Sequence, residues 1–383
     1  LKLYKFSLYF RRYLLLLHIQ FEKIDILMNI PQSDILSTSR LGKIFSNTVA
    51  TYKYFWFVSI MQIHAKEDCR RIDVWDIVIR MVANAWYPVH YFRLSFGKSD
   101  SLFDIVMELQ QNLNIPIDAN ADTIIDILSE RKEERPIKKL LNILTQHVPY
   151  RFLRPWIDTS DNKEMVIRSQ SLENNCLYSL HKEETEFYIM INPIWNQYLH
   201  VNYNILMDFA YWNLTLFLQT RNPNVPAIPS KLIRPEVRSS LNVQHKYWDT
   251  VMSIGGPIKC IYTGRELYPD DYDLDHFIPW SFVSHDLLWN LIPSDGSVNS
   301  SKSNKIPDVS IYLPKLAMLH HKSLQIMIAH GVETKVMEDY LSLGHTSREL
   351  ADMDEYHFRE LYERTFNPLS QIALNMGFET WKY

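Results

Sequence analysis

The stretch that decides the fold runs from residue 272 to residue 279 and reads YDLDHFIP. Asp275 and His276 are neighbours, so in an extended strand their side chains would point to opposite faces unless the strand ends or bulges there. We therefore predict a strand that ends at this pair, with Pro279 in the turn that follows. Farther along, the segment 299–302 (Asn-Ser-Ser-Lys) is expected to open a helix, because short polar side chains can cap free amides. The predicted order is strand, loop, strand, helix.

The polar residues of this stretch meet the chemical needs of phosphodiester hydrolysis, which requires a general base for the attacking water and a cation for the developing charge. Asp275 would supply an anionic oxygen and Asn299 a neutral one, and both are hard donors suited to Mg²⁺ or Mn²⁺. His276 then stays free to act as the base, since imidazole changes its charge near neutral pH. Lys302, one turn after Asn299, and Lys305 beyond it are expected to contact nucleic-acid phosphates.

The spacing of these residues resembles the HNH, or ββα-metal, nuclease motif, and especially the HNH domain of RNA-guided CRISPR nucleases. Asn290 follows His276 by 14 positions, and Asn299 follows Asn290 by 9. The neighbours Tyr-Asp-x-Asp-His-x-x-Pro, Ser281-Phe282 and Lys302 agree with that motif as well. The resemblance covers residues 255 to 310.

This resemblance implies a role for each motif residue. His276 would be the general base, Asp275 and Asn299 the metal ligands, and Asn290 the residue that braces the loop and orients the histidine. The implied activity is metal-dependent cleavage of DNA, with one strand nicked per site because the motif supplies one metal and one base. The rest of the chain lacks the guide-binding bulk of the CRISPR enzymes and looks more like stand-alone bacterial HNH proteins of restriction or phage defence, where protein partners of a defence system are expected.

The cysteines depart from a common HNH pattern. Many HNH proteins hold a structural zinc with two Cys-x-x-Cys pairs, whereas here Cys260 is followed by Thr263 and no cysteine occurs later. We therefore expect no structural zinc, and Cys260 buried as a small apolar residue. The other two cysteines, Cys69 and Cys176, lie too far away for a disulfide framework, which favours a reducing cytoplasm.

Composition favours an ordered, largely helical protein of several packed units, since 46% of the 383 residues are hydrophobic and only 9 are glycine. The net charge of −4 gives no global positive field, so any basic surface must be local. One such segment holds Lys231, Arg234, Arg238 and Lys246 against Glu236. It is either a patch that contacts phosphates or a solvated helix face, and the sequence favours neither.

We predict an α+β protein that is mostly helical, with the ββα-metal motif embedded in it. Its parts are a non-native leader at 1–27 before Met28, a helical domain at 28–157, a β-hairpin and helices at 158–250, the HNH domain at 251–310 and C-terminal helices at 311–383. No apolar run is long enough to span a membrane, and no secretion signal is recognised.

Several local predictions accompany this division. Asp73 should cap a helix from Val74 to Trp86 that Pro88 ends, and Tyr52 to Ile63 should form a buried helix face. A second helix is expected from Asp122 to about Lys132, a hairpin from the segments 176–180 and 186–191, a helix over 195–218, and a domain junction at 222–229. The last part should include helices over 334–341 and 353–363.

Structural interpretations account for the other conspicuous residues near the motif. We expect His285, His320 and His321 to be surface or satisfied core residues, and Trp280, Phe282 and Trp289 to pack around the loop. Asp270, Asp271 and Asp273 should form a solvated turn, with Asp273 close enough to tune the metal site. Two other functions stay open: a nucleic-acid- or partner-binding module without catalysis, and an RNA-cutting HNH toxin.

Overall fold

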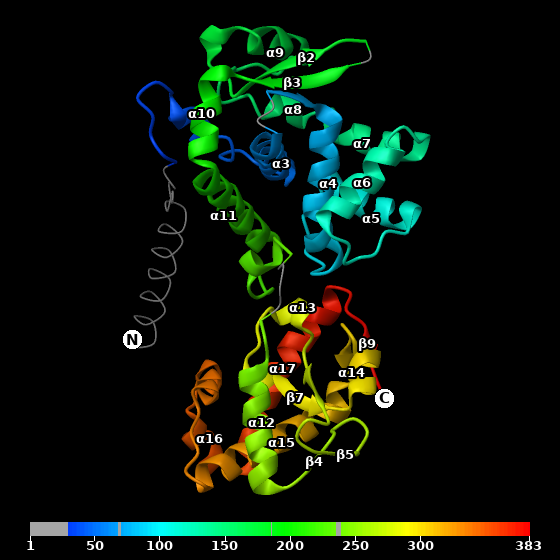
Figure 1. Ribbon diagram of the computed structural model, residues 1–383, viewed down its shortest axis with the longest axis vertical. Coiled ribbons are helices and arrows are strands. Elements are labelled where there is room, and N and C mark those ends of the chain that lie inside the picture. The colour runs from blue at the N-terminus through cyan, green and yellow to red at the C-terminus, as the bar shows by residue number, and fades with distance from the viewer. Residues whose placement is uncertain (1–29, 68–69, 185, 235–238) are drawn as a thin grey trace, which may run out of the picture.

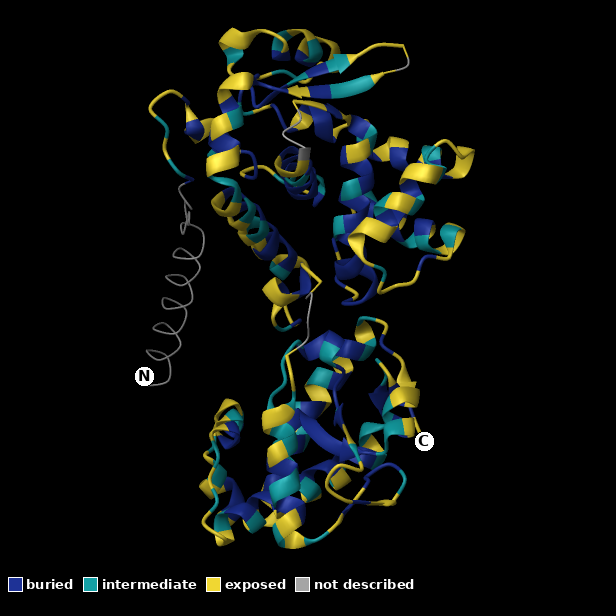
Figure 2. Cartoon of the chain, in the orientation of Figure 1, coloured by how far each residue is buried: buried dark blue, intermediate teal, exposed yellow. Residues whose placement is uncertain are grey.

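The computed structural model of the chain describes residues 30–67, 70–184, 186–234 and 239–383. The leader predicted at 1–27, Cys69 and Arg238 lie outside these ranges. Helices dominate and the sheets are small, so the predicted α+β class is confirmed. Buried apolar residues form two clusters, one from Ile30 to Leu232 and one from Tyr247 to Trp381. They are the cores of the two bodies in Figure 1, and Figure 2 shows the buried residues inside each.

The first body combines a set of helices with a three-stranded antiparallel sheet of order β1-β3-β2, which lies at the upper end of the molecule in Figure 1. Ile189 of β3 lies opposite both Leu180 of β2 and Ile72 of β1, so the predicted hairpin is present. Because β1 joins this hairpin, the segment predicted as a separate unit at 28–157 shares one sheet and one core with residues up to Leu232 of the segment predicted at 158–250. Tyr247 and Trp248 belong to the second core. The elements are α2 (Thr38–Gly42), α3 (Tyr52–Glu67), β1 (Arg71–Asp73), α4 (Val74–His90), α5 (Ser101–Leu113), α6 (Ala121–Arg131), α7 (Arg135–Thr145), α8 (Val148–Arg151), α9 (Asn162–Ser169), η1 (Leu172–Asn174), β2 (Tyr178–Lys182), β3 (Phe187–Ile191), α10 (Pro193–Val201), α11 (Tyr203–Arg221) and η2 (Ile228–Lys231).

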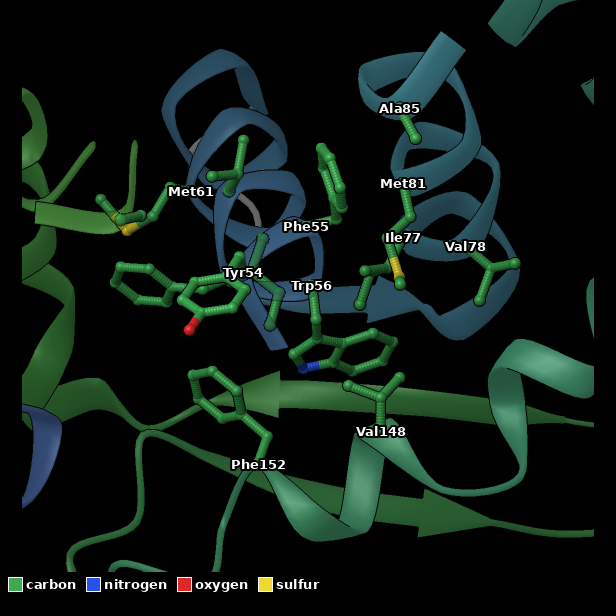
Figure 3. Close-up of a cluster of buried hydrophobic side chains, with 14 of the residues drawn as sticks. Tyr54, Phe55, Trp56, Met61, Ile77, Val78, Met81, Ala85, Val148 and Phe152 are labelled. Atoms are coloured by element: carbon green, nitrogen blue, oxygen red, sulfur yellow. The ribbon is translucent and has the colours of Figure 1, made fainter. Parts of the chain in front are cut away.

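Helix α3 is the centre of this core. Its residues 54–58 are all buried, so the helix is covered on every side and not only on the single face predicted from sequence. Neighbouring helices α4, α8 and α11 pack around it. Figure 3 shows Trp56 of α3 between Ile77 of α4 and Val148 of α8. The Trp56 indole N–H donates to the Tyr178 hydroxyl at 3.0 Å, which ties α3 to the sheet.

Two helix predictions differ from the structure at their ends. Helix α4 begins as predicted, with the Asp73 carboxylate accepting from the Trp75 amide, but it continues through Pro88 to His90. A proline near the end of a helix removes only one hydrogen bond, and the next turn re-forms here as the Tyr91 amide donates to the Tyr87 carbonyl. The predicted helix over 195–218 is two helices, α10 and α11, which are separated at Asn202.

The second body holds the motif and the C-terminal helices, with α15 packed on α12, α16 and α17. The predicted helix over 334–341 is the 3-10 helix η4, and the one over 353–363 is part of the longer α17. A short parallel pair, β8 with β9, was not predicted. The elements are α12 (Asn242–Gly255), β4 (Ile258–Lys259), β5 (Glu266–Leu267), β6 (Asp273–His276), α13 (Trp280–Val283), η3 (Leu288–Asn290), β7 (Leu291–Ser294), α14 (Gly296–Lys302), β8 (Ile306–Pro307), α15 (Val309–Ala329), η4 (Lys335–Leu343), α16 (Ser347–Asp352), α17 (Glu355–Asn375) and β9 (Thr380–Trp381).

The two bodies meet beside the motif. The rings of Phe92 and Trp280 lie 6.0 Å apart, and the Arg93 guanidinium donates to the Gly377 carbonyl and lies 5.0 Å from the Phe378 ring. Across the described ranges, we find no helix with the length and apolar content needed to cross a bilayer.

Candidate functional site

The frame of the site is the antiparallel pair β6 and β7 followed by helix α14. Asp275 lies opposite Ile292 and His276 opposite Leu291, and β6 ends at His276 as predicted. Helix α14 packs against β6. It begins at Gly296, where the Asp295 carboxylate caps it by accepting from the Ser297 amide at 3.0 Å. The segment 299–302 is therefore the last part of this helix and not its opening, because the capping residue is Asp295.

Asp275 lies inside the protein with both carboxylate oxygens hydrogen-bonded. Its side chain is 3% exposed, and Oδ1 accepts from Lys302 Nζ at 2.8 Å. Oδ2 accepts from the Tyr262 hydroxyl at 2.7 Å. Burial, together with the adjacent Asp275 charge, raises the pKa of Tyr262, so this phenol keeps its proton and donates.

Lys302 differs from the sequence interpretation. Its side chain is 1% exposed, and besides Asp275 its ammonium donates to the His276 carbonyl at 2.7 Å. A buried ammonium with two such partners is not a surface group, so the predicted contact with a substrate phosphate is not available in this arrangement. Its place in the structure is that of an internal cation next to Asp275.

His276 faces a different partner from its neighbour Asp275. Its Nε2 lies 2.8 Å from Asp286 Oδ1, and the two side chains are 14% and 24% exposed. A carboxylate only accepts hydrogen bonds, so this contact places a proton on Nε2. The other ring nitrogen, Nδ1, has no hydrogen-bond partner among the residues that the structure describes. Nδ1 is thus the ring nitrogen of His276 that is available to accept a proton from a bound water molecule.

Asp286 was missed by the sequence analysis, and the loop that carries it is firmly held. Its own carbonyl accepts from Gln244 Nε2 at 3.0 Å, and the amide of Leu288 donates to the Asp339 carboxylate at 2.7 Å. Helix α12 and η4 therefore both hold the loop. A single acidic residue in a loop has no periodic signal, which is why sequence spacing did not single it out.

Asn290 closes the opposite end of the same loop. It is fully buried, with Oδ1 accepting from the Ile278 amide and Nδ2 donating to the Ile278 carbonyl, both at 2.9 Å. The Phe277 amide donates to the Asn290 carbonyl at 2.9 Å as well. This is the bracing geometry expected of Asn290, whereas its effect on the orientation of His276 stays a prediction.

Asn299 is the remaining motif residue. It lies three residues before Lys302 and hence on the same side of α14, the helix that packs against β6. Its side chain is only partly buried, and the amide group of that side chain makes no hydrogen bond within the described part of the chain. Asn299 and Asp275 carry the oxygen donors predicted from sequence to bind a divalent metal, and amide and carboxylate oxygens are the kind of ligand that Mg²⁺ prefers.

Comparison with known families agrees with this frame, since residues 260–308 match the family model described as HNH endonuclease. This segment is similar to the HNH endonuclease family, and we call it the HNH domain. The matched range contains every motif residue together with Tyr262 and Asp286. No curated protein and no solved structure matches the chain. The narrower resemblance to the CRISPR nucleases stays a prediction.

The HNH domain lacks the kind of cluster that would hold a metal on protein side chains alone. Within residues 30–67, 70–184, 186–234 and 239–383, no group of three or more His, Cys, Asp or Glu residues is arranged to bind a metal ion. A cation on one carboxylate and one amide would complete its coordination with water and substrate phosphate, as Mg²⁺ commonly does. Cys260 is 2% exposed, which agrees with its predicted burial.

The basic residues proposed to contact nucleic acid are not one surface. Lys231 is fully buried, and its ammonium donates to the Pro226 carbonyl; burial lowers its pKa to about 7. It therefore does not belong to a patch that contacts phosphates, because its charge is enclosed by protein. Arg234 is exposed with its guanidinium 5.9 Å from the Tyr87 ring, and Lys305 is partly exposed beside Glu379. Arg238 lies outside the described residues.

The remaining residues near the HNH domain are largely structural. His320 is buried, and its Nδ1 lies 2.7 Å from the Tyr340 hydroxyl, whereas its Nε2 has no hydrogen-bond partner among the described residues. Burial lowers its pKa to about 3, so it is a neutral core residue whose hydrogen bonds are only half satisfied. Burial also lowers the pKa of His285 to about 4. The turn predicted as solvated is tied by Arg265, whose guanidinium pairs with Asp271 at 2.9 Å and with Asp295 at 2.7 Å.

Proposed function

We propose that the chain is a metal-dependent endonuclease that hydrolyses DNA phosphodiester bonds with His276 as its general base. The HNH domain supports a nuclease activity, and nucleic acid is the substrate class that this domain implies. The observation that carries the proposal is the contact between His276 Nε2 and Asp286 Oδ1, which leaves Nδ1 without a partner in the described chain.

In this proposal Nδ1 of His276 takes the proton of the attacking water. Nε2 keeps its proton on Asp286, whose negative charge stabilises the imidazolium that forms. The hydroxide oxygen bonds to phosphorus while the bond from phosphorus to the leaving ester oxygen breaks, and that oxygen takes a proton from solvent. Asn290 contributes by holding residues 277 and 278, so that the end of β6 keeps its direction.

Asp275 and Asn299 are proposed to hold one Mg²⁺ or Mn²⁺. When bound, the metal would neutralise the charge that develops on the phosphate. Lys305, a partly exposed lysine between α14 and β8, is proposed to contact the nucleic-acid backbone. No structural zinc is proposed.

The biological setting rests on the resemblance alone. We propose a stand-alone protein of restriction or phage defence that nicks one strand per site and acts in the cytoplasm, with other proteins of a defence system as partners. DNA is favoured over RNA on the same ground.

The test is cleavage by the full chain of supercoiled plasmid, single-stranded DNA and RNA, with and without Mg²⁺. We expect Mg²⁺-dependent nicking of plasmid, and loss of general-base function in His276→Ala should slow it about 10²- to 10⁴-fold. His330→Ala is the matched control, because His330 is an exposed histidine of the same body. Plasmid nicking by His276→Ala at the parental rate would remove the assigned base. Cleavage of RNA alone would favour the toxin, and binding without cleavage would favour the binding module.

A further inference from the structure

The buried pair of Lys302 and Asp275 has a consequence for metal binding. Nζ of Lys302 lies 2.8 Å from Asp275 Oδ1, and both side chains are almost completely enclosed. The other oxygen, Oδ2, is held by the Tyr262 hydroxyl. The Lys302 ammonium therefore occupies Oδ1, the Asp275 oxygen that a metal ion would need.

An ammonium and a divalent cation at one buried carboxylate oxygen repel each other strongly, because the protein interior screens charge weakly. The described residues offer no second carboxylate in contact with Lys302 that would balance the excess positive charge. The metal and the ammonium are therefore alternative partners of Asp275.

We propose that Lys302 is a built-in counter-cation that competes with the divalent metal for Asp275 and so sets the metal affinity of the site. The proposal rests on the proposed function, in that Asp275 is taken as a metal ligand. Without metal, Lys302 keeps the buried carboxylate paired and the end of β6 in place. When metal binds, the ammonium gives up Asp275 Oδ1.

The second contact of Lys302 extends this competition to the base. The same ammonium donates to the His276 carbonyl at 2.7 Å, so one side chain holds both the proposed metal ligand and the backbone of the proposed base. Displacement of Lys302 by metal would therefore also release the backbone carbonyl of His276. In the metal-free protein, the contact between Lys302 and Asp275 is the same contact that a metal ion would have to replace.

The experiment measures Mn²⁺ binding by calorimetry and by thermal unfolding of the full chain, in the parent and in Lys302→Met. Methionine has a similar length and carries no charge. We expect Lys302→Met to bind Mn²⁺ more tightly by about 10- to 100-fold, the range in which groups beside metal ligands alter metal affinity. In EDTA the variant should unfold at a lower temperature than the parent, and Mn²⁺ should restore it. Lys322→Met, on an exposed lysine of α15 in the same body, should bind Mn²⁺ like the parent.

Lys302→Gln covers the case in which the methionine variant does not fold, because it removes the charge and keeps a hydrogen-bond donor for the His276 carbonyl. If the variant that folds binds Mn²⁺ no more tightly than the parent, Lys302 does not compete with the metal and the proposal is wrong. If the parent nevertheless binds Mn²⁺ and cuts plasmid, the proposed function stands and only the role of Lys302 is lost. Absence of Mn²⁺ binding and of cleavage in every variant would remove both.

Discussion

Replacing Asp286 by asparagine removes the charge opposite His276 while keeping the size of the side chain. The carboxylate oxygen lies 2.8 Å from Nε2, and both groups are partly enclosed, with exposures of 24% and 14%. A hydrogen bond to a charged group contributes about 1.5–3 kcal/mol. Because about 1.4 kcal/mol corresponds to a tenfold change in rate, the loss should slow cleavage about 10- to 100-fold.

The assay is nicking of supercoiled plasmid under single-turnover conditions at saturating Mg²⁺, with DNA binding measured in parallel. We expect the rate to fall and the affinity for DNA to stay, because Asp286 acts through the histidine and not on the substrate. Asp354→Asn is the matched control: Asp354 also contacts a histidine, His357, but on the exposed start of α17, and asparagine still caps that helix. A folded Asp286→Asn protein that nicks within about twofold of the parental rate, a change of less than 0.5 kcal/mol, would refute the reasoning.

Three further predictions concern the stability of the fold. Asn290→Ala leaves the Ile278 amide and carbonyl without partners, so urea unfolding should show a loss of about 2–5 kcal/mol, and a loss below about 1 kcal/mol would contradict the bracing role. Burial lowers the pKa of Lys231 to about 7 in the folded protein, well below its unfolded value, so the free energy of unfolding of the parent should increase as the pH rises from 7 towards 10. The Lys231→Met variant should unfold at a higher temperature than the parent at pH 7, and its stability should not show this increase with pH. Burial lowers the pKa of His320 to about 3 in the folded protein, so the free energy of unfolding of the parent should fall as the pH drops below about 6.5. This group contributes at most about 1.4 kcal/mol per pH unit. The same dependence of stability on pH in the His320→Gln variant would contradict this prediction.

The parts of the site that sequence predicts are those fixed by the backbone. Adjacent residues of a strand point to opposite faces, so the strand was predicted to end at Asp275 and His276 if both side chains belong to one site. Strand β6 does end at His276. Asn290 was predicted from the resemblance of its spacing to the HNH motif, and in the structure its amide satisfies a donor and an acceptor of Ile278 at once. The partners that depend on side-chain packing were not predictable. Tyr262 reaches Asp275 from outside the strand pair, and Asp286 reaches His276 from a loop without a repeating pattern.

The same division applies to the fold. Helix starts with a local signal, such as Asp73 at α4, follow from sequence, whereas Pro88 does not stop that helix because the following turn makes its own hydrogen bond. Charge alone does not predict exposure, because Lys231 and Lys302 look like surface cations in the sequence and both are buried. The ammonium of Lys231 lies near the ring of Phe92, which is distant in the chain, and that of Lys302 pairs with the buried Asp275. Strand β9 has two residues and its partner precedes α15, so no local pattern reveals it.

The pairing of β9 with β8 has a consequence for the order in which the site is assembled during synthesis. Trp381 of β9 lies against Tyr262, with ring centroids 5.2 Å apart, and its indole N–H donates to the Ser301 hydroxyl of α14 at 3.4 Å. The wall behind Asp275 is therefore finished by residues that the ribosome adds only after α15 and α17. A nascent chain that has just exposed the whole HNH motif still lacks this wall. The surroundings of Asp275 are therefore complete only once β9 has been synthesised and has paired with β8.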